Sequence, residues 1–279
     1  MGELTRKQAK LLKRQISKLY NRDYIPLRTS DSTIEVGDIL KNRFDVIPEV
    51  DGSVLNVGAD DYEDGTKYNN NITSNSDVKV RVKLAGDAHL TELFDIDETG
   101  VKVDFSGKNE MLLKVKGLRQ RSLKNVPEVK RRIMERFVKG EISSKVFVVV
   151  GVVLADKYYL QYSGKRGGSV AFTIEGDVTG VDVEVDADFK YKMEKDVSYS
   201  VDGKNGGVLA YAVSSLRLNK YLLSPEINRR LLDGESEVDI MEAMSEDERK
   251  ALIESDAIEL SDLSAQFFLN QLEEEGDDA

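Results

Sequence analysis

The sequence predicts an α+β protein: a twisted, mostly antiparallel sheet with flanking helices, followed by a short helical C-terminal tail. Apolar residues recur at helical spacing near the start, alternate with charged residues through the middle, and accompany helix-capping sequences near the end. The chain has 279 residues, of which 40% are hydrophobic, so it is long enough for one large domain and a small appendage. We expect the main domain over residues 1–223 and an acidic tail over residues 224–279.

The first expected element is an amphipathic helix over residues 1–21. Its apolar side is formed by Leu4, Leu11, Leu12, Ile16 and Leu19. Its other side carries Arg6, Lys7, Lys10, Lys13, Arg14 and Lys18. A basic helix of this kind either lies on an anionic membrane surface or, more commonly, packs its apolar side on its own domain.

Strands are expected after a polar stretch over residues 51–76, whose Asp, Asn and Gly content predicts a long connection. Apolar residues then occupy alternate positions, at Val78, Val80, Val82 and Leu84, at Val101, Val103 and Phe105, and at Met111, Leu113 and Val115. A turn sequence over residues 106–109 separates the last two runs. This spacing predicts strands that are apolar on one side and charged on the other.

A basic segment over residues 114–139 follows, with Pro127 opening a short helix inside it. Its basic residues are Lys114, Lys116, Arg119, Arg121, Lys124, Lys130, Arg131, Arg132, Arg136 and Lys139. Residues 146–154 are apolar at almost every position and predict a buried strand, with residues 158–162 as an alternating strand after it.

Residues 181–192 alternate strictly between apolar and charged side chains. Strands of soluble proteins usually have about 5–6 residues, whereas a strand that crosses a bilayer needs roughly 9–11, with one side toward lipid. The length and the alternation of this segment therefore match a membrane-crossing strand. Strands over residues 197–201 and 208–218 complete the predicted sheet.

Charge divides the chain into two parts. The net charge is −11, yet residues 225–279 carry 18 acidic and only four basic side chains, which leaves residues 1–224 at +3. Ser236 with Asp239 and Ser245 with Glu248 fit capping boxes, and the last helix is expected to expose an apolar side to a partner surface. An acidic tail of this kind either masks a basic body or simply keeps the protein soluble.

No catalytic group of residues is found in the sequence. The chain has no cysteine and a single histidine, His89, which we interpret as structural. Asp60–Gly65 begins like a calcium loop, but Tyr62 and Asn71 stand where ligands belong. Ser163–Gly168 lacks the Walker spacing. We therefore expect no enzymatic activity, no cofactor and no metal.

The order of these elements resembles the gasdermin pore-forming domain. The resemblance rests on the basic N-terminal helix, the strand Lys145–Val153 with its partner Tyr158–Tyr162, and the closing strand Val208–Val213. Tyr24–Leu27, Val36–Leu40 and the short tail look like the bacterial branch of the family. The resemblance spans roughly residues 4–268.

The resemblance implies a cytoplasmic monomer that its tail keeps inactive until a protease cuts between domain and tail. The freed domain would bind anionic lipid, form a large homo-oligomer and insert two hairpins, about residues 77–116 and 170–201, into the inner membrane. The result would be cell death, commonly as antiphage defence. Bacterial members typically carry an acylated N-terminal cysteine, which is missing here.

The resemblance also implies a role for specific residues. The lipid-binding residues would be Lys10, Lys13, Arg14, Arg119, Arg121, Lys124, Lys130, Arg131 and Arg132. The membrane-inserting residues would be Val78, Val80, Val82, Val181, Val183, Val185 and Phe189. Cleavage would fall near Leu222, Leu223 and Ser224, and the autoinhibitory contacts would be Leu263, Phe267, Phe268 and Leu272.

Two other interpretations remain open at the level of sequence. One is an α+β binding or scaffold module whose acidic tail contacts a partner. The other is nucleic-acid binding through Arg119–Arg136, which we do not expect because the chain lacks a helix-turn-helix signature or an aromatic stacking platform.

Overall fold

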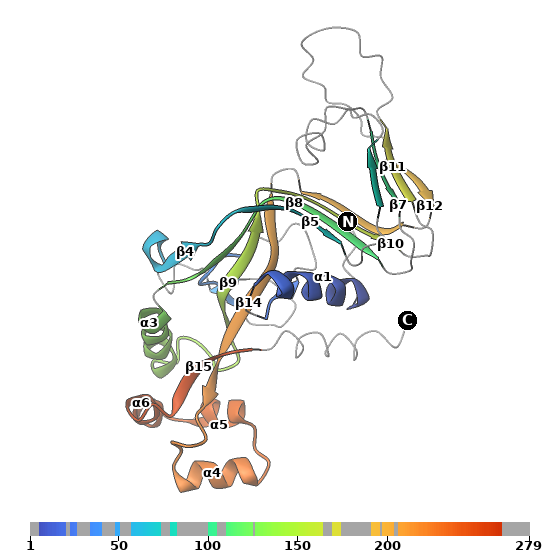
Figure 1. Cartoon of the computed structure of the whole chain (residues 1–279). Coiled ribbons are helices and arrows are strands. Elements are labelled where there is room, and N and C mark those ends of the chain that lie inside the picture. The colour runs from blue at the N-terminus through green and yellow to red at the C-terminus, as the bar shows by residue number, and fades with distance from the viewer. Residues whose placement is uncertain are drawn as a thin grey trace.

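The computed structural model describes residues 6–20, 23–26, 34–40, 48–50, 57–73, 79–82, 100–104, 110–124, 126–163, 169–173, 191–195, 197–203 and 206–263. An 11-stranded sheet forms most of the structure (Figure 1). Its main path is β1-β14-β9-β8-β10-β13; off this path, β15 pairs with β14, β2 with β9, β3 with β2, and β4 and β5 with β8.

The strands of this sheet are β1 (Ile25–Pro26), β2 (Ile39–Leu40), β3 (Pro48–Val50), β4 (Tyr62–Asp64), β5 (Tyr68–Thr73), β8 (Met111–Leu123), β9 (Phe147–Ala155), β10 (Lys157–Ser163), β13 (Val197–Gly203), β14 (Gly207–Leu218) and β15 (Ile258–Asp262). A second, four-stranded sheet has the order β12-β11-β7-β6. Its strands are β6 (Lys79–Val82), β7 (Gly100–Asp104), β11 (Ser169–Thr173) and β12 (Tyr191–Lys195). Every described pairing is antiparallel, so the predicted α+β class with a mostly antiparallel sheet is confirmed.

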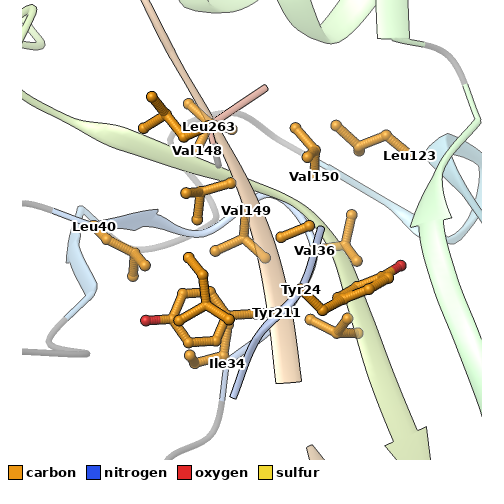
Figure 2. Close-up of a cluster of buried hydrophobic side chains, with 14 of the residues drawn as sticks. Tyr24, Ile34, Val36, Leu40, Leu123, Val148, Val149, Val150, Tyr211 and Leu263 are labelled. Carbon is orange, nitrogen blue, oxygen red and sulfur yellow. The ribbon is translucent and has the colours of Figure 1, made fainter. Parts of the chain in front are cut away.

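The core lies around β9 and β14, the two strands with the longest apolar runs. Val148–Val153 on β9 and Leu209–Leu216 on β14 are buried throughout, because elements cover both sides of these central strands. Figure 2 shows Val149 and Tyr211 from this pair among the buried side chains of Tyr24, Ile34 and Val36, which come from the N-terminal part of the chain.

The strand β8 changes partner at Gly117. Residues before it pair with β10 and residues after it pair with β9. Gly117 has φ +65°, and a Cβ there would overlap the carboxylate of Asp156. A side chain is therefore excluded both by the backbone conformation and by the neighbouring residue, and glycine is what allows the strand to bend here.

The helices expected near the N-terminus and after Pro127 are confirmed where the structure describes them. Helix α1 (Arg6–Leu19) buries Leu12 and Ile16, although Leu19 from its predicted apolar side is 42% exposed. Helix α3 (Val126–Val138) includes Pro127 in its first turn and buries Ile133 and other apolar residues of one side. None of the helices in the described part of the chain is long and apolar enough to cross a membrane.

The described part of the tail, up to Leu263, contains three capped helices: α4 (Pro225–Leu232), α5 (Glu237–Ala243) and α6 (Glu246–Glu254). Each begins after a serine, Ser224, Ser236 or Ser245, whose hydroxyl accepts a hydrogen bond from the helix backbone. The reciprocal capping box is present at Ser245 with Glu248.

Two segments differ from the sequence prediction. Residues 51–76, expected as a connection, contain β4 and β5, because both strands pair with β8 and pairing overrides the weak strand propensity of Asn and Asp. The tail, expected to be helical, contains β15, which pairs with β14. Leu263 is therefore at the end of a strand, and Phe267, Phe268 and Leu272 lie outside the described residues.

Candidate functional site

Four chain segments run from the large sheet into the small one. β5 precedes β6, β7 precedes β8, β10 precedes β11, and β12 precedes β13. The lateral order is the same on both sides, β5-β8-β10-β13 in the large sheet and β6-β7-β11-β12 in the small sheet. The small sheet thus extends the large one (Figure 1), and almost all of its residues come from the two segments, 77–116 and 170–201, that are expected from the sequence as hairpins.

The central pair of strands keeps one register through both sheets. Tyr162 pairs with Met111 in the large sheet, and Ser169 pairs with Asp104 in the small sheet. Six residues lie between these paired positions on each strand, so the alignment does not shift. We call the β8–β10 and β7–β11 pairings, which share this register, the central seam. On the β5–β6 side the connections differ by two residues, five against seven.

The small sheet separates apolar from charged positions by row. Two rows are apolar across β6, β7 and β11: Val80, Val103 and Val170 form one, and Val82, Val101 and Phe172 form the other. The row between them consists of Arg81, Lys102 and Ala171. Successive rows belong to opposite faces of a sheet, so the register is that of an amphipathic sheet.

Of the residues predicted to enter the membrane, Val80 and Val82 lie on β6. The others, Val78, Val181, Val183, Val185 and Phe189, lie outside the described residues. The twelve-residue alternating segment is therefore represented only by its last two residues, Tyr191 and Lys192, at the start of β12.

Most arginines of the predicted lipid-binding cluster form ion pairs inside the domain. On α3, Arg131 lies 2.7 Å from the Glu128 carboxylate, and Arg132 lies 3.1 Å from both Glu128 and Asp61. Hydrogen bonds from Arg131, and then from Arg132, outweigh desolvation and lower the pKa of Glu128 to about 2. These cations are already neutralised by local carboxylates.

The arginines on β8 are paired as well. Arg121 binds both carboxylate oxygens of Asp64, at 2.5 and 2.9 Å, and Arg119 binds Asp156, which Lys67 also contacts at 2.7 Å. The hydrogen bond from Arg121 holds the pKa of Asp64 below its usual range, against a smaller effect of burial. This network ties β4, β8 and the β9–β10 turn together, which is a structural role.

Other predicted cations are better placed to meet an anionic surface. Lys10 and Arg14 are exposed on α1, and Lys124 is exposed after β8. In the part of the chain that the structure describes, these three and Lys130 form no ion pair, whereas Lys13 lies 3.0 Å from Asp23. The predicted basic cluster therefore divides into a paired set and an unpaired set.

One carboxylate and one guanidinium of the tail bind the region around the end of α3. Glu242 on α5 accepts hydrogen bonds from the Ser144 amide and hydroxyl, both at 2.6 Å, and from the Ser143 hydroxyl at 2.9 Å. Arg249 on α6 donates to the Phe137 carbonyl at 3.0 Å and lies 4.7 Å from the centre of its ring. Burial raises the pKa of Glu242, but the Ser144 and Ser143 hydrogen bonds outweigh it and leave the pKa lowered.

The predicted cleavage region lies in the turn between β14 and α4. Tyr221 is 96% and Leu222 47% exposed, whereas Leu223 is only 8% exposed and Ser224 caps α4. The bond between Tyr221 and Leu222 is therefore flanked by two exposed side chains, whereas the bond after Leu222 adjoins the buried Leu223.

Sequence reasoning missed Glu242, Ser144, Arg249 and the strand β15. The alternation of Ile258 and Leu260 with Glu259 and Ser261 is a period-two signal that was available for β15. The contacts of Glu242 and Arg249 had no local signal, because their partners are about 100 residues away in sequence. A scan against protein-family models and a search of curated proteins found no match for this chain.

Proposed function

We propose that this chain is an autoinhibited pore-forming protein of the gasdermin type. Proteolytic removal of the C-terminal tail frees a domain that binds acidic lipid, assembles with other copies and inserts its hairpin strands into the inner membrane. Cell death follows, as an antiphage defence. In the inactive state the protein is a cytoplasmic monomer.

The observation that carries this proposal is the small sheet. The segments 77–116 and 170–201 are expected from the sequence as two separate hairpins, and strands from both lie side by side in one sheet through the β7–β11 pairing. A membrane strand needs satisfied backbone groups, one apolar face and about 9–11 residues. A paired, amphipathic sheet that continues strands of the main domain is a suitable starting point for such an element.

Charge and tail contacts support the same proposal. The body is basic and the tail strongly acidic, and α5, α6 and β15 of that tail contact α3, the loop after it and β14. Removing the tail takes away a net charge of −14 from residues 225–279. A body at about +3 is then attracted to an anionic leaflet, where each nearby cation contributes about 1 kcal/mol.

Dye release from liposomes tests the proposal. Full-length protein and a chain ending after Leu223 are added to vesicles of anionic lipid and to matched vesicles of neutral lipid. Release is expected only with the shortened chain and the anionic vesicles. A shortened chain that is folded by circular dichroism but releases no dye would favour the binding-module alternative, and a gel shift with nucleic acid would test the remaining one.

A further inference from the structure

The outer edge of β14 is occupied by a strand from the tail. β14 pairs with β9 on one edge and with β1 and then β15 on the other. Ser214–Leu218 pair in order with Asp262–Ile258. The ladder extends beyond both ends, because the Leu263 amide donates to the Val213 carbonyl and the Asn219 amide to the Ala257 carbonyl, each at 2.9 Å.

The tail helices are consequently an insertion inside a β14–β15 hairpin. Residues 220–256 leave the sheet after Asn219 and return at Ala257, which is hydrogen-bonded to Asn219. A cut in the turn near Leu222 breaks the chain of this insertion at one point only. The cut lies before helices α4, α5 and α6 in the sequence, and β15 follows them. The cut therefore removes none of the β14–β15 pairing.

Side chains of the tail also share the core of the body. Apolar tail residues belong to the same buried cluster as β9 and β14: Ile240, Met241, Leu252, Ala257, Ile258 and Leu263. Figure 2 shows Leu263 in this cluster together with Val148 and Tyr211. Exposing these residues to water is unfavourable whether or not the chain is continuous at Leu222.

We infer that Ser214–Leu218 of β14 form a strand-accepting edge whose partner is residues 258–262 of this chain, and that this edge retains the C-terminal segment as a bound fragment after the connection is cut. Cleavage and release are then separate steps. Main-chain pairing with a sheet edge, with side chains seated in the core beside it, is the recognition mode of strand addition. The inference deepens the proposed function, since it names what must be displaced before the body is free.

The test uses the full chain with a recognition sequence for a site-specific protease inserted between Tyr221 and Leu222. After complete cutting, size-exclusion chromatography is run without denaturant and without lipid, at decreasing protein concentration. The two fragments are expected to elute together at the position of the uncut protein. Separation of the fragments at micromolar concentration would overturn the inference.

The substitution Ser261→Pro tests the strand itself. Hydrogen-bonded pairs alternate in an antiparallel ladder, so the Leu263–Val213 and Asn219–Ala257 bonds place the Ser261 amide toward β14. Ser261→Pro removes this donor, and binding of the cut fragment is expected to weaken at least about tenfold. Ser261→Thr, which keeps the amide and favours a strand, is the matched control and should behave like the parent. Equal retention in both variants would show that β15 does not hold the fragment.

Hydrogen exchange on the cut parent protein gives a result that needs no variant. The amides of Glu259 and Ser261 are expected to stay protected after cutting, whereas exchange as fast as in a free peptide would overturn the inference. Both readouts are made without membranes. A protein that retains its fragment but never releases dye, even when shortened, would therefore contradict the proposed function and leave the strand-accepting edge intact.

Discussion

At the scale of single residues, the structure distinguishes side chains that hold the fold from those that are available to a partner. Arg119 and Arg121 look like candidates for anion binding in the sequence, yet they pair with Asp156 and Asp64. Glu242 looks like one acidic residue among many in the tail, yet it accepts three hydrogen bonds from the body. The role of a charge is set by its partners rather than by its sign.

Gly117→Ala is expected to destabilise the domain. The residue has φ +65° and would place its Cβ on the Asp156 carboxylate, so backbone strain and overlap act together. We expect a loss of about 2–4 kcal/mol in the free energy of unfolding, measured by urea titration. Gly58→Ala is the matched control, because a Cβ on Gly58 would have no heavy atom within 4 Å. Equal midpoints for the two variants would contradict this account of the bend.

Acid is expected to loosen the tail through Glu242. The pKa of this carboxyl is lowered in the fold from its ordinary value of 4.5, so its contribution is fully present above 4.5 and is lost as the pH falls through the lowered pKa. Hydrogen exchange of α5 amides, measured relative to the intrinsic rate at each pH, should therefore speed up as the pH falls below 4.5. Glu242→Gln should speed it up already at pH 7, by an amount equivalent to about 1 kcal/mol because the carboxylate is only partly buried. Glu254→Gln, on an exposed residue of α6, should change little; a similar effect of both variants would contradict the assignment.

At the scale of elements, the central seam and the β14–β15 pairing are the two arrangements with a direct bearing on the mechanism. The seam holds one register through both sheets, whereas the neighbouring β5–β6 side is offset by two residues. An even offset keeps every residue on its face, so the amphipathic pattern survives on that side as well. The strands of the small sheet are therefore aligned with those of the large sheet.

Cysteine pairs measure the central seam directly, since the chain has no cysteine of its own. Val103 and Val170 are directly paired, so Val103→Cys with Val170→Cys should form a disulfide under mild oxidation. Val82→Cys with Val170→Cys is the control, because β6 and β11 are separated by β7. Under the proposed function, the cross-linked shortened chain should still release dye. Cross-linking of the control pair to the same extent would refute the strand order.

Limited proteolysis of the native protein is expected to nick first within residues 219–234. Tyr221 is 96% exposed in the turn between β14 and α4, and a cut there breaks no strand pairing. Mass spectrometry of the early products should show a body of about 220 residues. A first cut within residues 51–76, with this turn intact, would count against an accessible linker.

At the scale of the whole molecule, charge and architecture divide the chain in different places. The charge changes sign near Pro225, but the tail returns to the sheet as β15. The boundary at residue 223 is thus a boundary of charge and of helix content, while the sheet extends across it. With this arrangement, a cut between β14 and α4 breaks the chain between body and tail but leaves the pairing of β15 with β14 in place.

Unpaired and paired cations are expected to differ in their effect on lipid binding. Lys10→Gln with Arg14→Gln, on the exposed side of α1, should weaken binding of the shortened chain to anionic vesicles roughly 30-fold, since each cation near the surface contributes about 1 kcal/mol. Arg131→Gln, which removes a cation paired with Glu128 and Glu135, should weaken it less than about threefold. Vesicle sedimentation at fixed salt measures both. An equal loss in the two variants would mean that the ion pairs of α3 open at the membrane.

The sequence by itself determined the elements that have a strong local signal. The spacing of Leu12 and Ile16 predicts α1, the apolar run at Val148–Val153 predicts β9, and the serine caps predict α5 and α6, because each signal is contained within a few residues. The same alternation that predicts β6 and β7 also predicts which residues of each strand share a face.

Only the tertiary structure decided which of these elements meet. The Asn-rich β5 has little strand preference of its own, and both β5 and the tail strand β15 pair with edges that β8 and β14 offer them. Glu242 accepts a hydrogen bond from Ser144, and Arg121 donates one to Asp64, across separations of 98 and 57 residues. Such contacts join residues that are far apart in the sequence and close together only in the folded chain. A pattern confined to neighbouring residues therefore cannot predict them.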